Sequence, residues 1–239
     1  MAAAAVVGSA LVSKSSWGDA ATCRWCGVDG AGLPAVPGVD RWAHRVLRWD
    51  SPDRAAALSH GAVALAYALP VAGLVVVDRG ASGTYWRDVL VVANSYALTQ
   101  LTTDVAKRTF RRSRPPVVFD RQPIHVAGDV HSYFSGHTST AFAAVTSAAT
   151  IAARRGRRHA RWIGWTGVGL ASAAGYLRMA ADRHYLTDVL TGAALGSAIG
   201  LAVPRLFDGG RPGPRWARAR LQISTVGGGV GVVGALSLP

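Results

Sequence analysis

The sequence contains no glutamate, so all 13 of its acidic residues are aspartate. Lysine is almost as rare, because only Lys14 and Lys107 stand among the 26 basic residues. Charged residues make up 16% of the chain, against about 25% in an average soluble domain. Half of the chain is hydrophobic, which excludes a protein that is disordered throughout.

Cysteine is also scarce, because Cys23 and Cys26 are the only two. A structural zinc site needs four ligands, so one close pair does not make one. A redox pair usually stands in a βαβ context, and no such pattern surrounds these residues. We therefore expect a small structural disulfide in an exported loop, with two unpaired thiols as the alternative.

The acidic residues are too few to balance the basic ones, and the formal net charge is +13. Such a charge favours an anionic partner. Nucleic-acid binders usually place basic residues on polar modules with interleaved aromatic residues. Here the basic residues form short clusters between long apolar runs. We therefore expect anionic lipid or phosphate as the partner, and no nucleic acid.

Five uncharged runs of 15 to 17 residues follow one another along the chain, at 61–77, 89–103, 138–153, 162–177 and 189–204. Each is shorter than the roughly 18 to 20 apolar residues that indicate a membrane span. Five in succession with charged connectors predict an all-α, multi-helix bundle, and favour a polytopic membrane bundle over a soluble one. Gly192, Gly196 and Gly200 repeat every fourth residue, which predicts a helix face for close packing.

These patterns divide the chain into three parts. Residues 1–54 read as an exported or irregular segment with short helices, 55–204 as the helical bundle, and 205–239 as a basic linker with a Gly-rich tail that is β-rich or flexible. Residues 1–13 are apolar without a preceding basic residue, so a shortened signal sequence and a simple apolar terminus both remain open.

Two polar segments flank the second and third apolar runs. Lys107 and Arg114 stand seven residues apart before Pro115, which predicts a cationic helix end with Arg111 on the same stripe. Ser135-Gly136-His137 opens the third run. A serine at a helix start is a usual N-cap, and free helix-start amides attract an anion.

A third polar segment precedes the last apolar run. His184 and Asp188 stand at i and i+4, which predicts that they share one face of a helix. A carboxylate there can hold one ring nitrogen protonated, leaving the other as nucleophile or base. Arg178 offers a planar fork that suits phosphate oxygens. Each of the three segments by itself also fits an ordinary helix end or a solvated basic face.

Taken together and in this order, the three segments are far more specific. The pattern Lys107-x6-Arg114-Pro, Ser-Gly-His137, Arg178-x5-His-x3-Asp188 resembles the three-part signature of the type 2 phosphatidic acid phosphatase superfamily, which also includes bacterial acid phosphatases and vanadium haloperoxidases. The resemblance covers about residues 55 to 204. Phe134 stands where the family usually has proline, and Leu177 where it usually has serine; we expect these departures to reduce or alter activity at most.

The resemblance implies a role for each matched residue. His184 would be the nucleophile that forms a phosphohistidine, Asp188 would orient it, and His137 would act as general acid and then as base. The phosphoryl oxygens would be held by Lys107, Arg114, Ser135, Gly136 and Arg178. No metal and no cofactor would be needed, although vanadate could bind in the same pocket as an inhibitor or, in a haloperoxidase, as the cofactor.

The function implied is that of a metal-independent phosphatase acting on lipid phosphate or pyrophosphate monoesters, in a multi-pass protein of the bacterial inner membrane. The alternatives are a soluble non-specific acid phosphatase, a vanadium-dependent haloperoxidase, and a basic lipid-binding protein without activity. Arginine clusters at 154–161 and 205–220 lie two apolar runs apart, so both belong on the cytoplasmic side. The site would then face the periplasm or cell exterior. The oligomeric state stays open.

Overall fold

The structure, a computed structural model, describes residues 21–77, 85–157, 159–207, 219–226 and 229–236. The chain divides into two compact units, Met1–Arg205 and Leu206–Pro239. In the second unit, strands β1 (Ala219–Val226) and β2 (Gly229–Leu236) pair in antiparallel register. The expectations for residues 1–13, and for the arginines at 158, 211, 215 and 218, lie outside the described residues.

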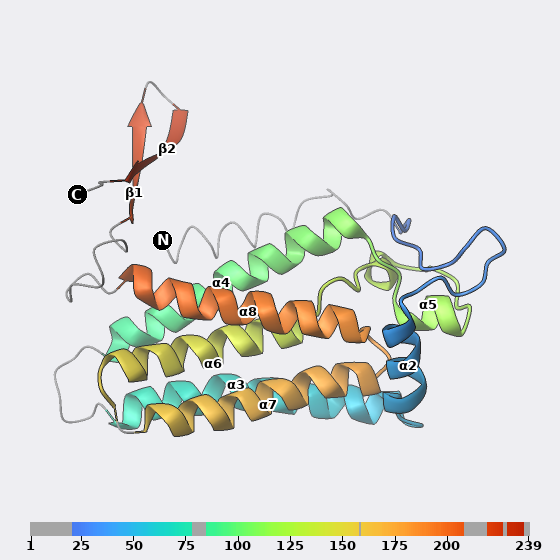
Figure 1. Cartoon of the computed structure of the whole chain (residues 1–239), viewed down its shortest axis with the longest axis horizontal. Helices are drawn as coiled ribbons and strands as arrows, with labels where there is room; N and C mark the ends of the chain where they lie inside the picture. Colours follow the sequence, from blue (N-terminus) through green and yellow to red (C-terminus); the bar gives the residue numbers. More distant parts are fainter. Residues whose placement is uncertain (1–20, 78–84, 158, 208–218, 227–228, 237–239) are drawn as a thin grey trace. The chain divides into compact units, whose positions relative to one another are not determined.

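Five long helices form the first unit, and each contains one of the five apolar runs. They are α3 (Pro52–Val77), α4 (Tyr85–Phe110), α6 (Gly136–Arg154), α7 (Ala160–Ala180) and α8 (Leu186–Phe207). Helix α6 contacts α3, α4 and α7, so it is central in the bundle (Figure 1). The prediction of an all-α, multi-helix bundle is confirmed.

Three short elements lie outside the long helices. They are α2 (Gly38–Leu47), α5 (Pro115–Phe119) and a 3₁₀ turn, η1 (Ala127–Val130). In Figure 1, α2 and α5 lie at the end of the bundle where α6 and α8 begin. Helices α6 and α8 run away from this end, and α7 runs toward it. The start of α6, the end of α7 and the start of α8 therefore lie together there (Figure 1).

Helix α8 packs against α6 with almost no space between their backbones. A Cβ atom added to Gly192 would lie 2.8 Å from the carbonyl oxygen of Ser135, and Cβ atoms at Gly196 and Gly200 would come closer still to the backbone of α6. Real Cβ atoms do not approach other atoms so closely. The close-packing face predicted from the glycine spacing is therefore confirmed.

The interior of the bundle is built from small apolar residues and hydroxyl groups. Ala66, Ala141, Val145 and Ala171 form one buried cluster. Hydroxyl pairs cross between helices, at 3.0 Å for Ser95–Ser147, 3.1 Å for Thr103–Ser139 and 2.6 Å for Tyr67–Thr140. Hydrogen bonds of this kind, together with small residues, hold helices together where the surroundings are apolar.

Large apolar side chains lie on the outside instead. The exposed ones on the long helices include Leu58, Leu65, Leu69, Leu90, Leu190 and Leu201. Two stretches, Pro52–Leu74 and Leu186–Phe207, are long and apolar enough to cross a membrane. At the end of the bundle away from α2, Arg155, directly after α6, forms an ion pair with Asp88 of α4.

Replacing Gly196 with alanine tests the close contact between α6 and α8. The new Cβ would overlap the backbone of Ser139, so the helices must separate and the thermal unfolding temperature should fall. Gly169→Ala in α7 is the matched control, because nothing lies within 4 Å of its added Cβ. Alanine favours a helix over glycine by up to about 1 kcal/mol, so the control should not be destabilised. Equal unfolding temperatures for both variants would contradict the contact.

Candidate active site

The eight residues singled out from the three motifs meet at one end of the bundle. Lys107 is in the last turn of α4, and Arg114 directly precedes α5. The others stand at the start of α6 (Ser135, Gly136, His137), in the last turn of α7 (Arg178), before α8 (His184) and in its first turn (Asp188). Five separate chain segments therefore supply the site.

The first motif does not continue as a helix to the prolines, so that prediction is wrong. Helix α4 ends at Phe110, and Arg111 has a φ of 43°. Arg114 has an extended backbone, as expected for a residue before proline. Lys107, Arg111 and Arg114 thus share no helical stripe. Arg111 donates to the hydroxyl of Thr22 at 3.0 Å, away from the other motif residues.

His184 and Asp188 do not lie on one face of a helix either, because α8 begins only at Leu186. They still approach each other, since the side chain of Asp188 reaches back over the helix start. Its Oδ2 accepts the backbone N–H of Tyr185 at 3.1 Å, as a carboxylate at the third helical position often does. The same oxygen lies 3.6 Å from Nδ1 of His184.

A backbone carbonyl holds the His184 ring more closely than Asp188 does. Nδ1 of His184 lies 2.8 Å from the carbonyl oxygen of Ser132, which accepts only from a protonated nitrogen. The Ser132 hydroxyl donates to Oδ2 of Asp188 at 2.6 Å, so Ser132 contacts both residues. With the proton on Nδ1, the lone pair of Nε2 is left for chemistry.

His184 is 3% exposed, and its surroundings keep it neutral. Burial lowers the pKa of His184 well below its usual value, and the charges of Arg114, Arg178 and Lys107 lower it further. An imidazole that is neutral at pH 7 is a competent nucleophile.

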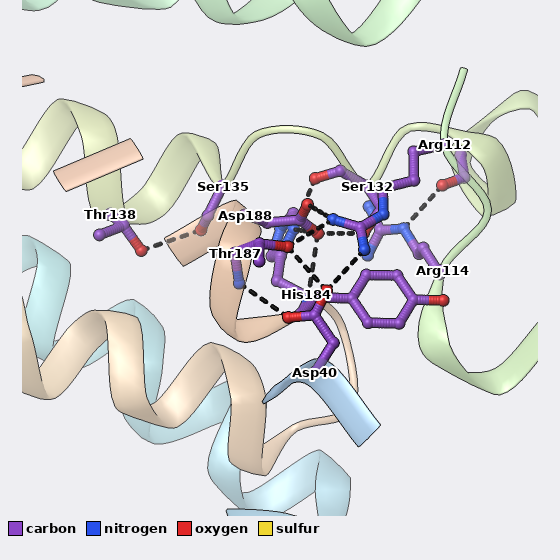
Figure 2. Close-up of polar contacts among 11 residues, drawn as sticks. Asp40, Arg112, Arg114, Ser132, Ser135, Thr138, His184, Thr187 and Asp188 are labelled. Carbon is purple, nitrogen blue, oxygen red and sulfur yellow. Dashed lines mark hydrogen bonds and ion pairs between the residues drawn. The ribbon is translucent and has the colours of Figure 1, made fainter. Parts of the chain in front are cut away.

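Arg112, which the sequence analysis did not single out, is buried between two carboxylates. Its Nη1 donates to Oδ1 of Asp188 at 2.5 Å and to the hydroxyl of Thr187 at 2.8 Å, and its Nη2 donates to Oδ2 of Asp40 at 2.8 Å. Asp40 in turn accepts the backbone N–H of Thr187 at 2.9 Å. Figure 2 shows this network linking α2, the segment after α4 and the start of α8.

Two aromatic rings cover the faces of the Arg112 guanidinium, Trp25 at 4.1 Å and Tyr185 at 4.0 Å. Trp25 lies in the loop closed by Cys23 and Cys26, which form a disulfide as expected. The Trp25 carbonyl accepts the backbone N–H of Ser113 at 3.1 Å, so the loop is fixed beside Arg112. The cysteine pair therefore supports the site from outside it.

Three cationic side chains surround the start of α6. A Cβ added to Gly136 would lie 3.4 Å from Nζ of Lys107, so a side chain here would crowd the ammonium group. Arg114 donates from Nε to the carbonyl of Gly128 at 2.7 Å, and burial followed by the charge of Arg183 lowers the pKa of Arg114 to about 10. It remains charged at pH 7.

Arg178 is the third cation, and it is 7% exposed. Its Nη1 lies 3.4 Å from the hydroxyl of Ser59 in α3, and its buried Nε makes no hydrogen bond within the described part of the chain. Leu177 beside it packs against the alanines at 180 and 181, so this departure from the family pattern serves the packing. A buried guanidinium with an unused N–H is suited to receive an anion.

Ser135 is the N-cap residue of α6 by position, but its hydroxyl does not cap the helix. The hydroxyl accepts from Thr138 at 2.9 Å, and the Ser135 backbone N–H donates to the carbonyl of Asp188 at 3.1 Å. This bond joins the start of α6 to the start of α8. Next to it, Nε2 of His137 lies 3.1 Å from Nδ1 of His60 in α3.

Four members of the site were missed from the sequence: Asp40, His60, Arg112 and Ser132. Arg112 and Ser132 lie within or just before motifs, but arginine and serine are common there. Asp40 and His60 stand more than 70 residues from their partners. No motif or spacing in the sequence marks Asp40, because its burial and its partners are seen only in the structure.

Among the described residues, no three His, Cys, Asp or Glu side chains are grouped as a metal site would require.

Comparison with known proteins identifies the family. The profile of the PAP2 superfamily matches residues 88–211, about half of the chain and all three motifs. The chain belongs to the PAP2 superfamily, so the resemblance inferred from the motifs is confirmed.

Two individual proteins are similar to this chain. A lipid A 1-phosphatase of Porphyromonas gingivalis is 32% identical over 122 residues, which is 51% of this chain and 24% of that protein. The match therefore spans about a quarter of the length of the curated relative. A crystal structure of a transmembrane PAP2-type phosphatidylglycerolphosphate phosphatase from Bacillus subtilis has a TM-score of 0.49 at 21% identity, covering 72% of this chain and 83% of that one.

Replacing Arg112 with alanine should destabilise the protein strongly. Asp40 and Asp188 would lose their buried counter-charge, which typically costs about 3 to 5 kcal/mol. Arg41→Ala, at an exposed neighbouring position in α2, is the matched control. Thermal unfolding of the detergent-purified proteins measures the difference. An Arg112 variant as stable as the control would mean that the ion pairs contribute nothing.

Proposed function

We propose that the protein is a phosphatase that hydrolyses phosphate or pyrophosphate monoesters of lipids through a phosphohistidine, without a metal ion. The observation that carries the proposal is the state of His184. The ring is buried, its Nδ1–H is held by the Ser132 carbonyl, and the charges of Arg114, Arg178 and Lys107 add to burial in lowering its pKa.

In the first step, Nε2 of His184 attacks phosphorus, the N–P bond forms, and the bond from phosphorus to the leaving oxygen breaks. His137 donates a proton to that oxygen, so the lipid alcohol leaves neutral. The positive charge that develops on the His184 ring is stabilised by Asp188, whose Oδ2 lies 3.6 Å from Nδ1. At this distance Asp188 acts on the ring through its charge. The hydrogen bond to Nδ1 is made by the Ser132 carbonyl.

In the second step, water attacks phosphorus from the side that the leaving group has vacated. His137, now neutral, takes the proton from the water. The N–P bond breaks, its electron pair returns to His184, and inorganic phosphate is released. His137 ends protonated and His184 ends neutral, so both residues regain their starting states and no net proton is consumed by the protein.

Phosphoryl transfer depends mainly on positioning and on charge stabilisation. Lys107, Arg114 and Arg178 supply three positive charges, and the amide of Gly136 at the start of α6 adds an N–H donor. These groups perform the charge neutralisation that a bound magnesium ion performs in many other phosphoryl-transfer enzymes. This is the physical basis for proposing a metal-independent reaction.

The lipid substrate class and the membrane location are inferred from the outer surface and from the curated relative. The long helices carry exposed leucines, and two stretches are long and apolar enough to span a bilayer. The curated relative carries the name lipid A 1-phosphatase. Candidate substrates are phosphatidate, phosphatidylglycerophosphate, prenyl pyrophosphates and lipid A phosphates.

The orientation follows from the end of the bundle away from the site. Exposed Trp86, Trp162 and Trp165 lie near the ends of α4 and α7, where tryptophans commonly mark a membrane interface. Arg154 ends α6, Arg155 and Arg157 follow it in the connector, and Arg161 is in the first turn of α7. By the positive-inside rule this end is cytoplasmic, and the site opens to the periplasm or cell exterior.

Phosphate release by the detergent-purified protein tests the proposal. Wild type should release phosphate from at least one lipid phosphate with EDTA present, and His184→Ala should release none. His125→Ala is the matched control, because His125 is an exposed histidine outside the site, and it should keep full activity. Activity that disappears with EDTA, or that persists in His184→Ala, would refute the proposed chemistry.

Substituting Arg178 tests the phosphoryl-binding role. Removal of one preorganised donor to a developing charge costs about 10²–10³ in rate, and we expect that loss in Arg178→Ala. Arg178→Lys keeps the charge without the planar fork and should recover only part of it. The exposed Arg41 in α2 provides the control, Arg41→Ala, with near wild-type rates. Initial rates on the preferred lipid phosphate measure all three, and a loss of less than threefold in Arg178→Ala would argue against the role.

A further inference from the structure

A second histidine directly contacts the proposed general acid. His60 lies in the third turn of α3, and its Nδ1 is 3.1 Å from Nε2 of His137. The two rings are 4.8 Å apart between centroids and tilted by 63°, an edge arrangement in which the nitrogens point toward each other. This distance fits a hydrogen bond between ring nitrogens, in which one nitrogen donates and the other accepts.

The chemistry of the proposed reaction decides which nitrogen donates. To protonate a leaving oxygen, His137 must carry a proton on the nitrogen that faces the substrate. A charged His137 has N–H groups on both nitrogens, so its Nε2 can only donate toward His60. Nδ1 of His60 must then be unprotonated, and Nδ1 of His137 is left to address the leaving oxygen.

Cations surround His137 and oppose its charged form. The groups that face it are Lys107 from α4, Arg114 from the segment before α5, Arg178 from α7, His184 from the segment before α8 and His60 from α3. Among them, only the two histidines have ring nitrogens that can accept a hydrogen bond, because lysine and arginine side chains only donate. An acceptor for the N–H of a charged imidazole stabilises that charge, as the carboxylate does in a catalytic triad.

His60 is suited to this task because it is exposed while His137 is partly buried. When Nδ1 of His60 accepts, its own proton lies on Nε2, where it can exchange with water. Resting on the proposed function, we propose that His60 is a positioning residue: its neutral Nδ1 accepts the Nε2–H of His137, fixes the orientation of that ring, and shares the positive charge of the general acid.

The first test uses two substitutions of His60 and two leaving groups. His60→Ala removes the acceptor. His60→Asn can place its amide oxygen close to the position of Nδ1, so it retains one. A short-chain phosphatidate has a poor alkyl leaving group that needs the proton, and p-nitrophenyl phosphate has a good one that needs it much less. General acid catalysis accelerates a reaction about 10²–10⁴-fold. We expect His60→Ala to reduce this acceleration about tenfold.

The expected result is selective. His60→Ala should lower kcat for the phosphatidate about tenfold more than kcat for p-nitrophenyl phosphate, and His60→Asn should recover most of the loss. The basic limb of the pH–rate profile should move to lower pH in His60→Ala, since the charged His137 is less stabilised. His125→Ala should change neither. Equal losses on both substrates, or a faster His60→Ala enzyme, would overturn the proposal.

A second measurement does not depend on turnover. Nitrogen-15 NMR of histidine-labelled protein distinguishes protonated from unprotonated ring nitrogens, and it should show a donor at Nε2 of His137 and an acceptor at Nδ1 of His60 in wild type. An unprotonated Nε2 on His137 at the pH of optimal activity would refute the pairing. Wild type with this pairing but without phosphatase activity would refute the proposed function while leaving the hydrogen bond intact.

Discussion

The buried guanidinium of Arg112 is the contact on which the geometry of this site depends. It lies between Asp40 of α2 and Asp188 of α8, with Trp25 and Tyr185 on its two faces. A charge in such a place is stable only while both carboxylates remain beside it, and each carboxylate is stable only with the guanidinium. One group therefore fixes the N-terminal segment, the segment after α4 and the last helix relative to one another, and with them the carboxylate nearest to His184.

The same buried surroundings explain why the His184 ring is oriented by a backbone carbonyl and not by a carboxylate. Asp188 already receives Arg112, the Ser132 hydroxyl and the Tyr185 amide, so little of its capacity remains for the ring. The Ser132 carbonyl takes the Nδ1–H instead, which fixes the tautomer without adding charge. The carboxylate acts at 3.6 Å as a counter-charge, and its effect grows only when the ring becomes positive.

The sequence predicted the parts of this protein that depend on local pattern. The five helices followed from five apolar runs, and the α6–α8 contact followed from the spacing of Gly192, Gly196 and Gly200. The eight site residues came from their motifs, and their roles stay predictions. The helix geometry of two motifs was wrong, because Arg111 leaves the helix and α8 begins only after His184. Asp40, His60, Arg112 and Ser132 were missed, because their partners are 52 to 77 residues away or are backbone atoms, which carry no signal in composition or period.

The glycine face of α8 has a consequence for how this protein can diverge. The start of α6 carries Ser135 and His137, the start of α8 carries Asp188, and the spacing between them is set by backbone against backbone. At Gly192, Gly196 and Gly200, helix α8 presents no side chain whose exchange could alter that spacing. The exposed leucines can therefore be replaced by other apolar residues while the distances among Ser135, His137 and Asp188 stay the same. The exposed apolar surface can therefore change without moving the residues gathered at the end of the bundle.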